Sequence, residues 1–299
     1  MNFKKILNPA LLVLAALIWG VAFVAQKSGA GYVGPFALVA ARSFIAGAAL
    51  IPVIFLLGNK APKPIMGEGK KKDLIIGGVL CGTALFAASF FQQWGIDCGT
   101  NAGKAGFITA LYIIIVALCG IVIKKKVSIK VLIAVLVAVS GLYLLCVTEN
   151  SVMVASDLLV LCCAFIFSCH IMIIDYFSPR VECLKMSMIQ FFVCGTLSLI
   201  AMFISGEKNT LEDLMGAYIP ILYLGIMSSG VGYTLQIVGQ RGTDPTLASI
   251  LMSLESVFAV LAGTLFGERL DFRQIMGCVL MFAAIIMAQL PSKEKKKCE

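Results

Sequence analysis

The chain has 299 residues and a formal net charge of +8, with 60% hydrophobic and 13% charged residues. A soluble domain is about 45–50% apolar and about 25% charged, so this chain has too little polar surface to cover a globule in water. The composition disfavours soluble enzymes, nucleic-acid-binding modules and disordered proteins. It also leaves too little chain for a separate soluble domain.

Apolar segments separated by glycines and prolines predict ten membrane-spanning helices, because one span takes about 20 residues and lipid offers the backbone no hydrogen-bond partners. The expected spans are residues 9–26, 34–57, 74–96, 100–123, 128–147, 157–177, 184–204, 217–239, 245–266 and 271–290. The first follows Lys4 and Lys5 as a signal peptide would. It is longer than a signal-peptide core and has no small-residue cleavage site, so we expect it to remain as a span.

Positive charges alternate between the segments that join these spans. With a cytoplasmic N-terminus, eighteen of the 24 Lys and Arg residues fall on cytoplasmic segments, five fall on outer segments, and Arg42 lies within a span. Lys and Arg concentrate on the cytoplasmic side of membrane proteins. The bias predicts that both termini are cytoplasmic and that the lysine clusters set the topology beside lipid headgroups, with no nucleic-acid partner.

The chain contains a weak internal repeat. At an offset of 148 residues Val33 falls on Val181, and at an offset of 143 Gln93 falls on Gln236 and Gly99–Thr100 on Gly242–Thr243. Each half then holds five spans. Because five is odd, the second half enters the membrane from the opposite side, an arrangement seen in secondary transporters with a substrate site between the halves.

The stretch "SLESVFAVLAGTLFGERLDFRQIMGCVLMFAAII" near the C-terminus, together with "ALIWGVAFVAQK", Arg42 and "KAGFITALYIIIV", resembles the drug/metabolite transporter superfamily and most of all its EamA-type branch. The resemblance implies an all-α membrane protein of ten transmembrane helices in two inverted five-helix repeats, residues 1–148 and 149–299. It implies a multi-pass protein of the cell membrane that transports small metabolites, often outward. Ser256 and Ala117 stand where the family often has proline, so a kink there is expected to be weaker.

Glu255 is the first candidate for a functional residue, since an ionisable group in the middle of a span costs about 2.5–3.5 kcal/mol on insertion scales. It shares a helical arc with Ala248, Met252 and Ala259, away from the leucine-rich arc, so it is expected to face other helices or a cavity. Glu255 is either a protonation site or partner of a substrate amine, or a structural hydrogen-bonding group that fixes helix packing.

Two further ionisable residues lie within spans. Arg42 could face a substrate carboxylate, satisfy a carbonyl or helix end within the bundle, or extend to the membrane surface. His170 is the only histidine and titrates near neutral pH when unperturbed, so it is a candidate for proton coupling or a buried packing group.

An aromatic and polar set completes the candidates, because a small-molecule cavity needs apolar walls with a few fixed polar groups. Its members are Trp19, Gln92, Gln93, Thr109, Tyr112, Tyr233 and Gln236. Gln92 and Gln93 near the outer end of one span mirror Gln236 near the inner end of another, which suits alternate gates. The alternative is that these side chains make ordinary structural contacts between helices.

Several motifs of other functions are absent from the sequence. It has no GxxxxGK[ST] loop for ATP, no HExxH pair and no Gly-x-Ser-x-Gly elbow. With one His and no clustered metal ligands, the 11 cysteines are expected to act as small buried hydrophobic groups. We therefore expect no enzyme activity, no metal and no cofactor.

The sequence favours a secondary permease, an exporter by resemblance, that moves small metabolites such as amino acids or drug-like compounds by alternating access. The expected partners are the lipid bilayer, the small-molecule substrate and protons as a candidate coupling ion. The competing hypothesis is a channel or a membrane scaffold that transports nothing. A channel would show a continuous polar stripe on several helices, which the sequence lacks.

Overall fold

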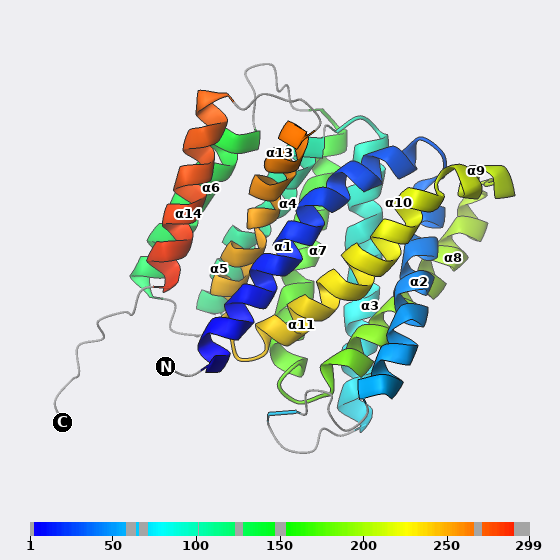
Figure 1. Cartoon of the computed structure of the whole chain (residues 1–299), viewed down its shortest axis with the longest axis horizontal. Helices are drawn as coiled ribbons and strands as arrows, with labels where there is room; N and C mark the ends of the chain where they lie inside the picture. The colour runs from blue at the N-terminus through cyan, green and yellow to red at the C-terminus, as the bar shows by residue number, and fades with distance from the viewer. Residues whose placement is uncertain are drawn as a thin grey trace.

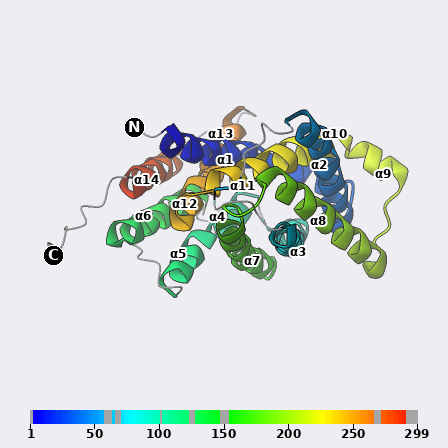
Figure 2. The same cartoon turned by 90° about the horizontal axis from the view of Figure 1, so that it is seen from below.

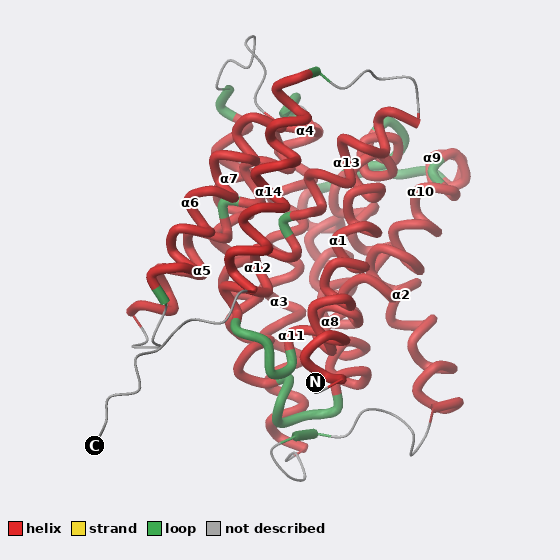
Figure 3. Tube along the Cα trace, turned by 60° about the vertical axis from the view of Figure 1, so that its left-hand side comes forward, coloured by secondary structure: helices red, strands yellow, loops and turns green. Residues whose placement is uncertain are grey.

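The computed structural model describes residues 3–57, 64–65, 71–100, 102–122, 128–146, 154–265 and 271–289. Their regular secondary structure is helical throughout, and no strand occurs among them. The helices lie side by side between two ends of the molecule (Figures 1 and 3). We call the end where the first helix begins the lower end, as drawn in Figure 1. Many of the lysines counted above, at 60, 63, 70, 124–126 and 293–297, and the turn at 267–270 lie outside the described residues.

The described chain is a series of helices, some of which follow one another within a single apolar segment long enough to cross a membrane. In order they are α1 (Phe3–Ala30), α2 (Pro35–Leu57), α3 (Lys71–Asp97), α4 (Ala102–Ala110), α5 (Tyr112–Val122), α6 (Ile129–Cys146), α7 (Ser156–Phe177), α8 (Cys183–Ser205), α9 (Leu211–Gly216), α10 (Tyr218–Leu222), the π-helix η2 (Tyr223–Tyr233), α11 (Thr234–Gln240), α12 (Pro245–Met252), α13 (Leu254–Leu265) and α14 (Phe272–Gln289).

Eight helical segments of the described chain are long and apolar enough to cross a membrane. Two more apolar helices, within α6 and α14, fall short of that length. Large apolar side chains such as Phe55, Leu136 and Ile286 are exposed on the outer surface. Such exposure is unfavourable in water and matches a surface that faces lipid tails.

Three of the expected spans are interrupted, which the sequence does not predict. The span over 100–123 is broken at Leu111, where backbone hydrogen bonds join residues three apart. The span over 245–266 is broken at Ser253, whose hydroxyl donates to the Ile250 carbonyl oxygen at 2.7 Å. The span over 217–239 contains η2, and such π-helical stretches occur frequently at functional sites.

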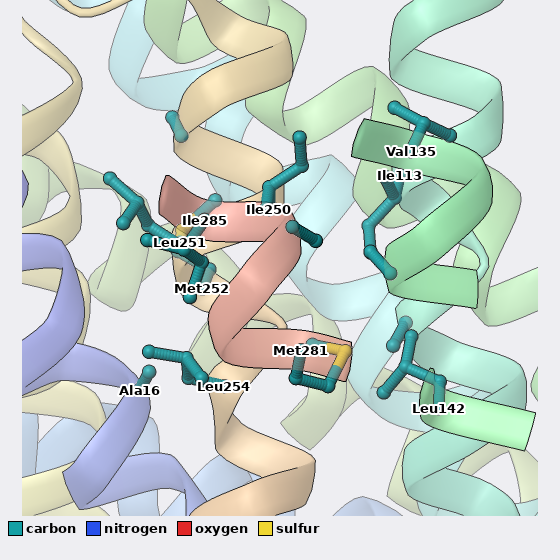
Figure 4. Packing of buried hydrophobic residues seen from close by; sticks show 14 of the residues in the cluster. Ala16, Ile113, Val135, Leu142, Ile250, Leu251, Met252, Leu254, Met281 and Ile285 are labelled. Carbon is teal, nitrogen blue, oxygen red and sulfur yellow. The ribbon is translucent and has the colours of Figure 1, made fainter. Parts of the chain in front are cut away.

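The largest buried hydrophobic cluster joins α5, α6, α12 and α14. Figure 4 shows Ile113 and Leu142 facing Ile250 and Met281 across this cluster. Ile113, Leu142, Ile250 and Met281 are each fully buried, so these helices meet there through apolar side chains. Tyr112, one of the candidates from the sequence, also belongs to this cluster.

Helix pairs at the two edges of the molecule cross at glycines (Figure 2). At one edge, a Cβ on Gly141 of α6 would lie 2.9 Å from the Gly277 carbonyl oxygen of α14, and a Cβ on Gly277 would lie 2.7 Å from that of Gly141. At the other edge, Gly47 of α2 contacts the Phe192 ring of α8, and Gly195 contacts Phe44 in return. The second crossing pairs residues that the offset of 148 aligns, Gly47 with Gly195 and Phe44 with Phe192.

Gly277→Ala is expected to destabilise the protein, because the added methyl group would push α14 away from the α6 backbone. Inserting a methyl group into a packed contact costs about 1–3 kcal/mol. Thermal unfolding in detergent should therefore occur a few degrees lower than for the wild type. Gly106→Ala is the matched control, since a Cβ there would meet its nearest neighbour at 3.6 Å. Equal unfolding temperatures for the two variants would contradict the close crossing.

The loop after α8 caps the beginning of α2. Glu207 Oε2 accepts a hydrogen bond from the Ala37 N–H at 3.0 Å, and Asn209 Oδ1 accepts one from the Gly34 N–H at 3.1 Å. Gly34 is required here because a Cβ would overlap the Glu207 carboxylate. Burial raises the pKa of Glu207 above its usual value, although backbone hydrogen bonds lower it.

Glu207→Ala is expected to cost about 1 kcal/mol, since it removes the acceptor that satisfies a free N–H at the beginning of α2. Glu207→Gln keeps an acceptor oxygen and should unfold close to the wild-type temperature. Because folding raises the pKa of Glu207, the folded state binds this proton more tightly than the unfolded state does. The free energy of unfolding of the wild type should therefore rise as the pH falls from the folded-state pKa to the usual pKa of a glutamate. Thermal unfolding at several pH values tests this: Glu207→Gln should lack that component. A wild-type pH profile identical to that of Glu207→Gln would contradict it.

Candidate functional site

A cavity lies in the middle of the bundle, where both halves of the chain contribute walls. It is lined by Trp19, Ala22, Phe23, Gln26, Arg42, Gln92, Thr109, Tyr112, Phe167, Ile171, Ser228, Tyr233, Gln236, Met252 and Glu255. The centres of water-sized molecules can occupy about 50 Å³ of it, which is room for a few waters. The walls must therefore separate before a larger molecule can enter.

Trp19 and Tyr233 form one aromatic wall of the cavity. The two ring centroids lie 4.8 Å apart, and the Trp19 indole N–H donates to the Ser228 carbonyl oxygen at 3.0 Å. Gly232 is needed beside them, because a Cβ there would lie 2.7 Å from the indole nitrogen. Ser228, Gly232 and Tyr233 belong to η2, so the irregular helix supplies both a carbonyl acceptor and close backbone approach.

Glu255 enters the cavity from the second position of α13, just after the break at Ser253. At this break the Ser256 N–H donates to the Ser253 carbonyl oxygen at 3.2 Å, which bridges α12 and α13. Only 6% of Glu255 is exposed. Gly20 of α1 allows this arrangement, since a Cβ there would lie 2.7 Å from the Glu255 carbonyl oxygen.

Arg42 reaches the same cavity from α2 and is likewise only 6% exposed. Neither Arg42 nor Glu255 forms an ion pair of 4 Å or less with another described residue. A buried charge without a partner is costly unless a ligand or water compensates it. The cavity therefore presents one fixed cation and one carboxyl group to whatever occupies it.

Some polar side chains of the cavity are held by hydrogen bonds to each other, and others have an atom without a partner among the described residues. Gln92 on α3 donates from Nε2 to the Thr109 hydroxyl oxygen at 3.1 Å. Thr109 and Tyr112 flank the break at Leu111, which turns both toward the cavity. Gln236 on α11 contributes an oxygen that has no partner among the described residues.

Eight of the ten residues proposed from the sequence line this cavity, and two do not. Gln93 points elsewhere and donates from Nε2 to Asp97 Oδ1 at 3.0 Å. His170 lies behind the wall, where Nε2 is 3.2 Å from Gln190 Oε1 and the ring contacts Tyr233 edge-on at 6.0 Å. Adjacent glutamines on one helix face different directions, so Gln92 and Gln93 cannot both enter one cavity.

Sequence reasoning missed Gln26 and Ser228. Gln26 lies within the family-like stretch of the first span, 5% exposed, and its Oε1 has no partner among the described residues. The signal available in the sequence was a polar glutamine within the same expected span as Trp19. Ser228 takes part through its backbone, for which the sequence carries no signal. Phe167 matches Trp19 in the repeat and also lines the cavity.

A model of the EamA-like transporter family matches the chain twice, at residues 9–147 and 154–289. The chain belongs to the EamA-like transporter family. A relative from Archaeoglobus fulgidus, named an uncharacterized transporter, is 31% identical over 289 residues, which cover 96% of this chain and 87% of the relative. A crystal structure of a protein 19% identical in sequence gives a TM-score of 0.78 and covers 94% of this chain and 96% of that one, so the two share a fold.

Membership of the EamA-like family identifies the chain as a transporter, and its apolar helices make it a multi-pass membrane protein. The family and the relative's name point to a transporter rather than an enzyme. An EamA-like transporter handles a small-molecule substrate, and the central cavity is the place in the described chain where polar and aromatic groups converge.

Proposed function

We propose that the chain is a secondary permease of the cell membrane that exports a small zwitterionic metabolite with an apolar side chain, such as an amino acid. The substrate binds in the central cavity, and the two halves of the chain expose it to either side of the membrane in turn. Both termini are cytoplasmic in this proposal, so the lower end of the molecule faces the cytoplasm. The bias of Lys and Arg in the sequence supports that orientation.

In this proposal ten helices span the membrane, as two inverted repeats at residues 1–148 and 149–299. The two separate matches of the family model support the division. The crossing in which Gly47 meets Phe192 and Gly195 meets Phe44 supports an inverted relation, because the offset of 148 aligns both pairs. In this proposal the bilayer thins locally around the shorter α6 and α14.

Matching features of the two halves also support the repeat. Gly99 and Gly242, which the repeat aligns, both have positive φ, +102° and +86°, at turns that follow α3 and α11. The breaks at Leu111 and Ser253 fall one position apart in the same alignment. Each half thus bends at the level of the cavity, where transporters with inverted repeats hold their substrates.

The observation that carries the substrate class is the presence of Arg42 and Glu255 on one small cavity without an ion pair between them. A guanidinium binds a carboxylate through paired N–H groups, and a carboxylate accepts hydrogen bonds from an ammonium group. Aromatic and aliphatic walls at Trp19, Phe167 and Met252 accommodate an apolar side chain. An apolar zwitterion satisfies all three features together.

Counterflow in liposomes tests the proposal with the full-length protein. Liposomes loaded with a candidate amino acid should take up the same labelled amino acid. Its decarboxylated amine and its N-acetylated form should compete at least about tenfold more weakly, because each loses one charged hydrogen bond. Absence of counterflow for all amino acids with folded protein, or a single-channel conductance, would overturn the permease.

A further inference from the structure

A line of buried polar side chains leads from the cavity toward the lower end of the molecule. It comprises His170 on α7, Gln190 on α8, and Gln236 and Gln240 on α11, each exposed by 3% or less. Helix α11 packs against both α7 and α8. Gln236 also lines the cavity, and Gln240 is the last residue of α11. The line therefore begins at the cavity and ends where α11 ends.

Each of these four side chains carries one polar atom without a protein partner among the described residues. The atoms are His170 Nδ1, Gln190 Nε2, Gln236 Oε1 and Gln240 Oε1. The side chains of His170 and Gln190 are nevertheless held in place, with Nε2 of the imidazole 3.2 Å from Oε1 of the amide. An unpaired buried polar atom is costly and lipid offers it no partner, so such atoms in proteins bind water.

Aromatic rings separate His170 and Gln190 from the cavity, whereas Gln236 opens directly onto it. The Tyr233 ring lies 4.8 Å from Trp19, 6.0 Å from His170 and 5.9 Å from Phe191, measured between centroids. A hydroxyl pair, Ser187 on α8 and Thr234 on α11, joins the two sides of the same seam at 2.9 Å. Tyr233 therefore stands between the cavity and His170, and the hydroxyl pair joins α8 to α11 beside it.

We propose that the seam between α7, α8 and α11 is a hydrated path from the cavity to the lower end, with Tyr233 as its constriction. Water binds along His170, Gln190, Gln236 and Gln240, and the substrate passes here when α11 moves away from α8. That last step rests on the permease proposed above. Hydration of the seam does not depend on it.

Two methionines test the hydration directly. Met186 lies on α8 in the cluster that includes Ile237 of α11, and Met281 lies on α14; both are 0% exposed. Hydroxyl radicals generated from bound water oxidise adjacent methionines. Footprinting of the intact protein in nanodiscs should therefore oxidise Met186 at least roughly fivefold faster than Met281. Equally slow oxidation of the two would overturn the hydrated seam.

Gln190→Leu tests the route, because leucine makes the seam apolar without entering the cavity. Substrate affinity should stay within about twofold of the wild type while counterflow falls by about tenfold. The control is Ser198→Ala on the same helix, a buried site whose hydroxyl bonds to the Cys194 carbonyl oxygen. Wild-type counterflow in Gln190→Leu, or loss of affinity in that variant, would overturn the route.

The two experiments separate the proposals. If the wild type itself transports no amino acid, the permease fails and Met186 oxidation alone decides whether the seam is hydrated. If the wild type transports and Met186 is protected, the seam is refuted while the permease stands.

Discussion

Glu255→Gln is expected to reduce proton-driven transport by roughly 10- to 100-fold, since a hydrogen bond to a charged group contributes about 1.5–3 kcal/mol. The amide keeps the size and shape of the side chain but cannot release or accept a proton at neutral pH. In the proposed permease Glu255 receives either the substrate ammonium group or the coupling proton in the cavity. Both roles require a carboxyl group.

The measurement is uptake driven by a pH gradient in liposomes, alongside counterflow without a gradient. If Glu255 carries only the proton, gradient-driven uptake is lost and counterflow remains. If it also binds the ammonium group, both fall. Glu182→Gln is the control, because Glu182 pairs with Lys185 at 2.8 Å on the surface. Full gradient-driven uptake by Glu255→Gln would show that proton coupling lies elsewhere.

Gly20→Ala is expected to have the second largest effect, on both stability and transport. A Cβ at position 20 would lie 2.6 Å from Phe258 Cβ and 2.7 Å from the Glu255 carbonyl oxygen. Helices α1 and α13 must then separate, at a cost of about 1–3 kcal/mol. Because the same crossing positions Trp19 and Glu255, transport per folded molecule should fall by about tenfold or more, as functional sites require positioning to within about 0.5 Å.

Thermal unfolding and counterflow of the same preparation separate the two effects. Gly31→Ala is a suitable control, since a Cβ there would lie 3.5 Å from its nearest neighbour. A Gly20→Ala protein that unfolds at the wild-type temperature would refute the close crossing. One that is destabilised but transports normally would show that the crossing does not position the site.

The sequence anticipated much of the cavity because helical geometry decides which residues share a face. In the sequence Glu255 shares a helical arc with Ala248 and Ala259, and Thr109 shares one with Ala105; small residues mark the sides of membrane helices that pack closely. The structure brings both to one cavity with Trp19 and Arg42. The sequence could not decide which of two adjacent residues faces the cavity, as with Gln92 and Gln93. A shift of one residue along a helix turns the side chain toward a different neighbouring helix.

His170 shows a second limit of the sequence. A lone histidine within a span is visible in the sequence, but its partner Gln190 lies on another helix. Helix breaks were also missed. At the break the Ser253 hydroxyl bonds to the Ile250 carbonyl oxygen, and within η2 Gly225 and Gly232 lie against Ile45 and Trp19 of other helices, which no local pattern shows.

By itself the sequence determined that this chain is helical and lies in a membrane, because apolar segments without backbone partners in lipid have to form helices. It also determined the order of the segments and which faces are small or polar. The tertiary structure alone decided that Arg42 and Glu255, more than 200 residues apart, share a cavity without pairing. It did so because glycines such as Gly20 of α1, which lies against α13, set how closely two helices approach. The distance between two helices depends on both of them, so neither segment encodes it alone.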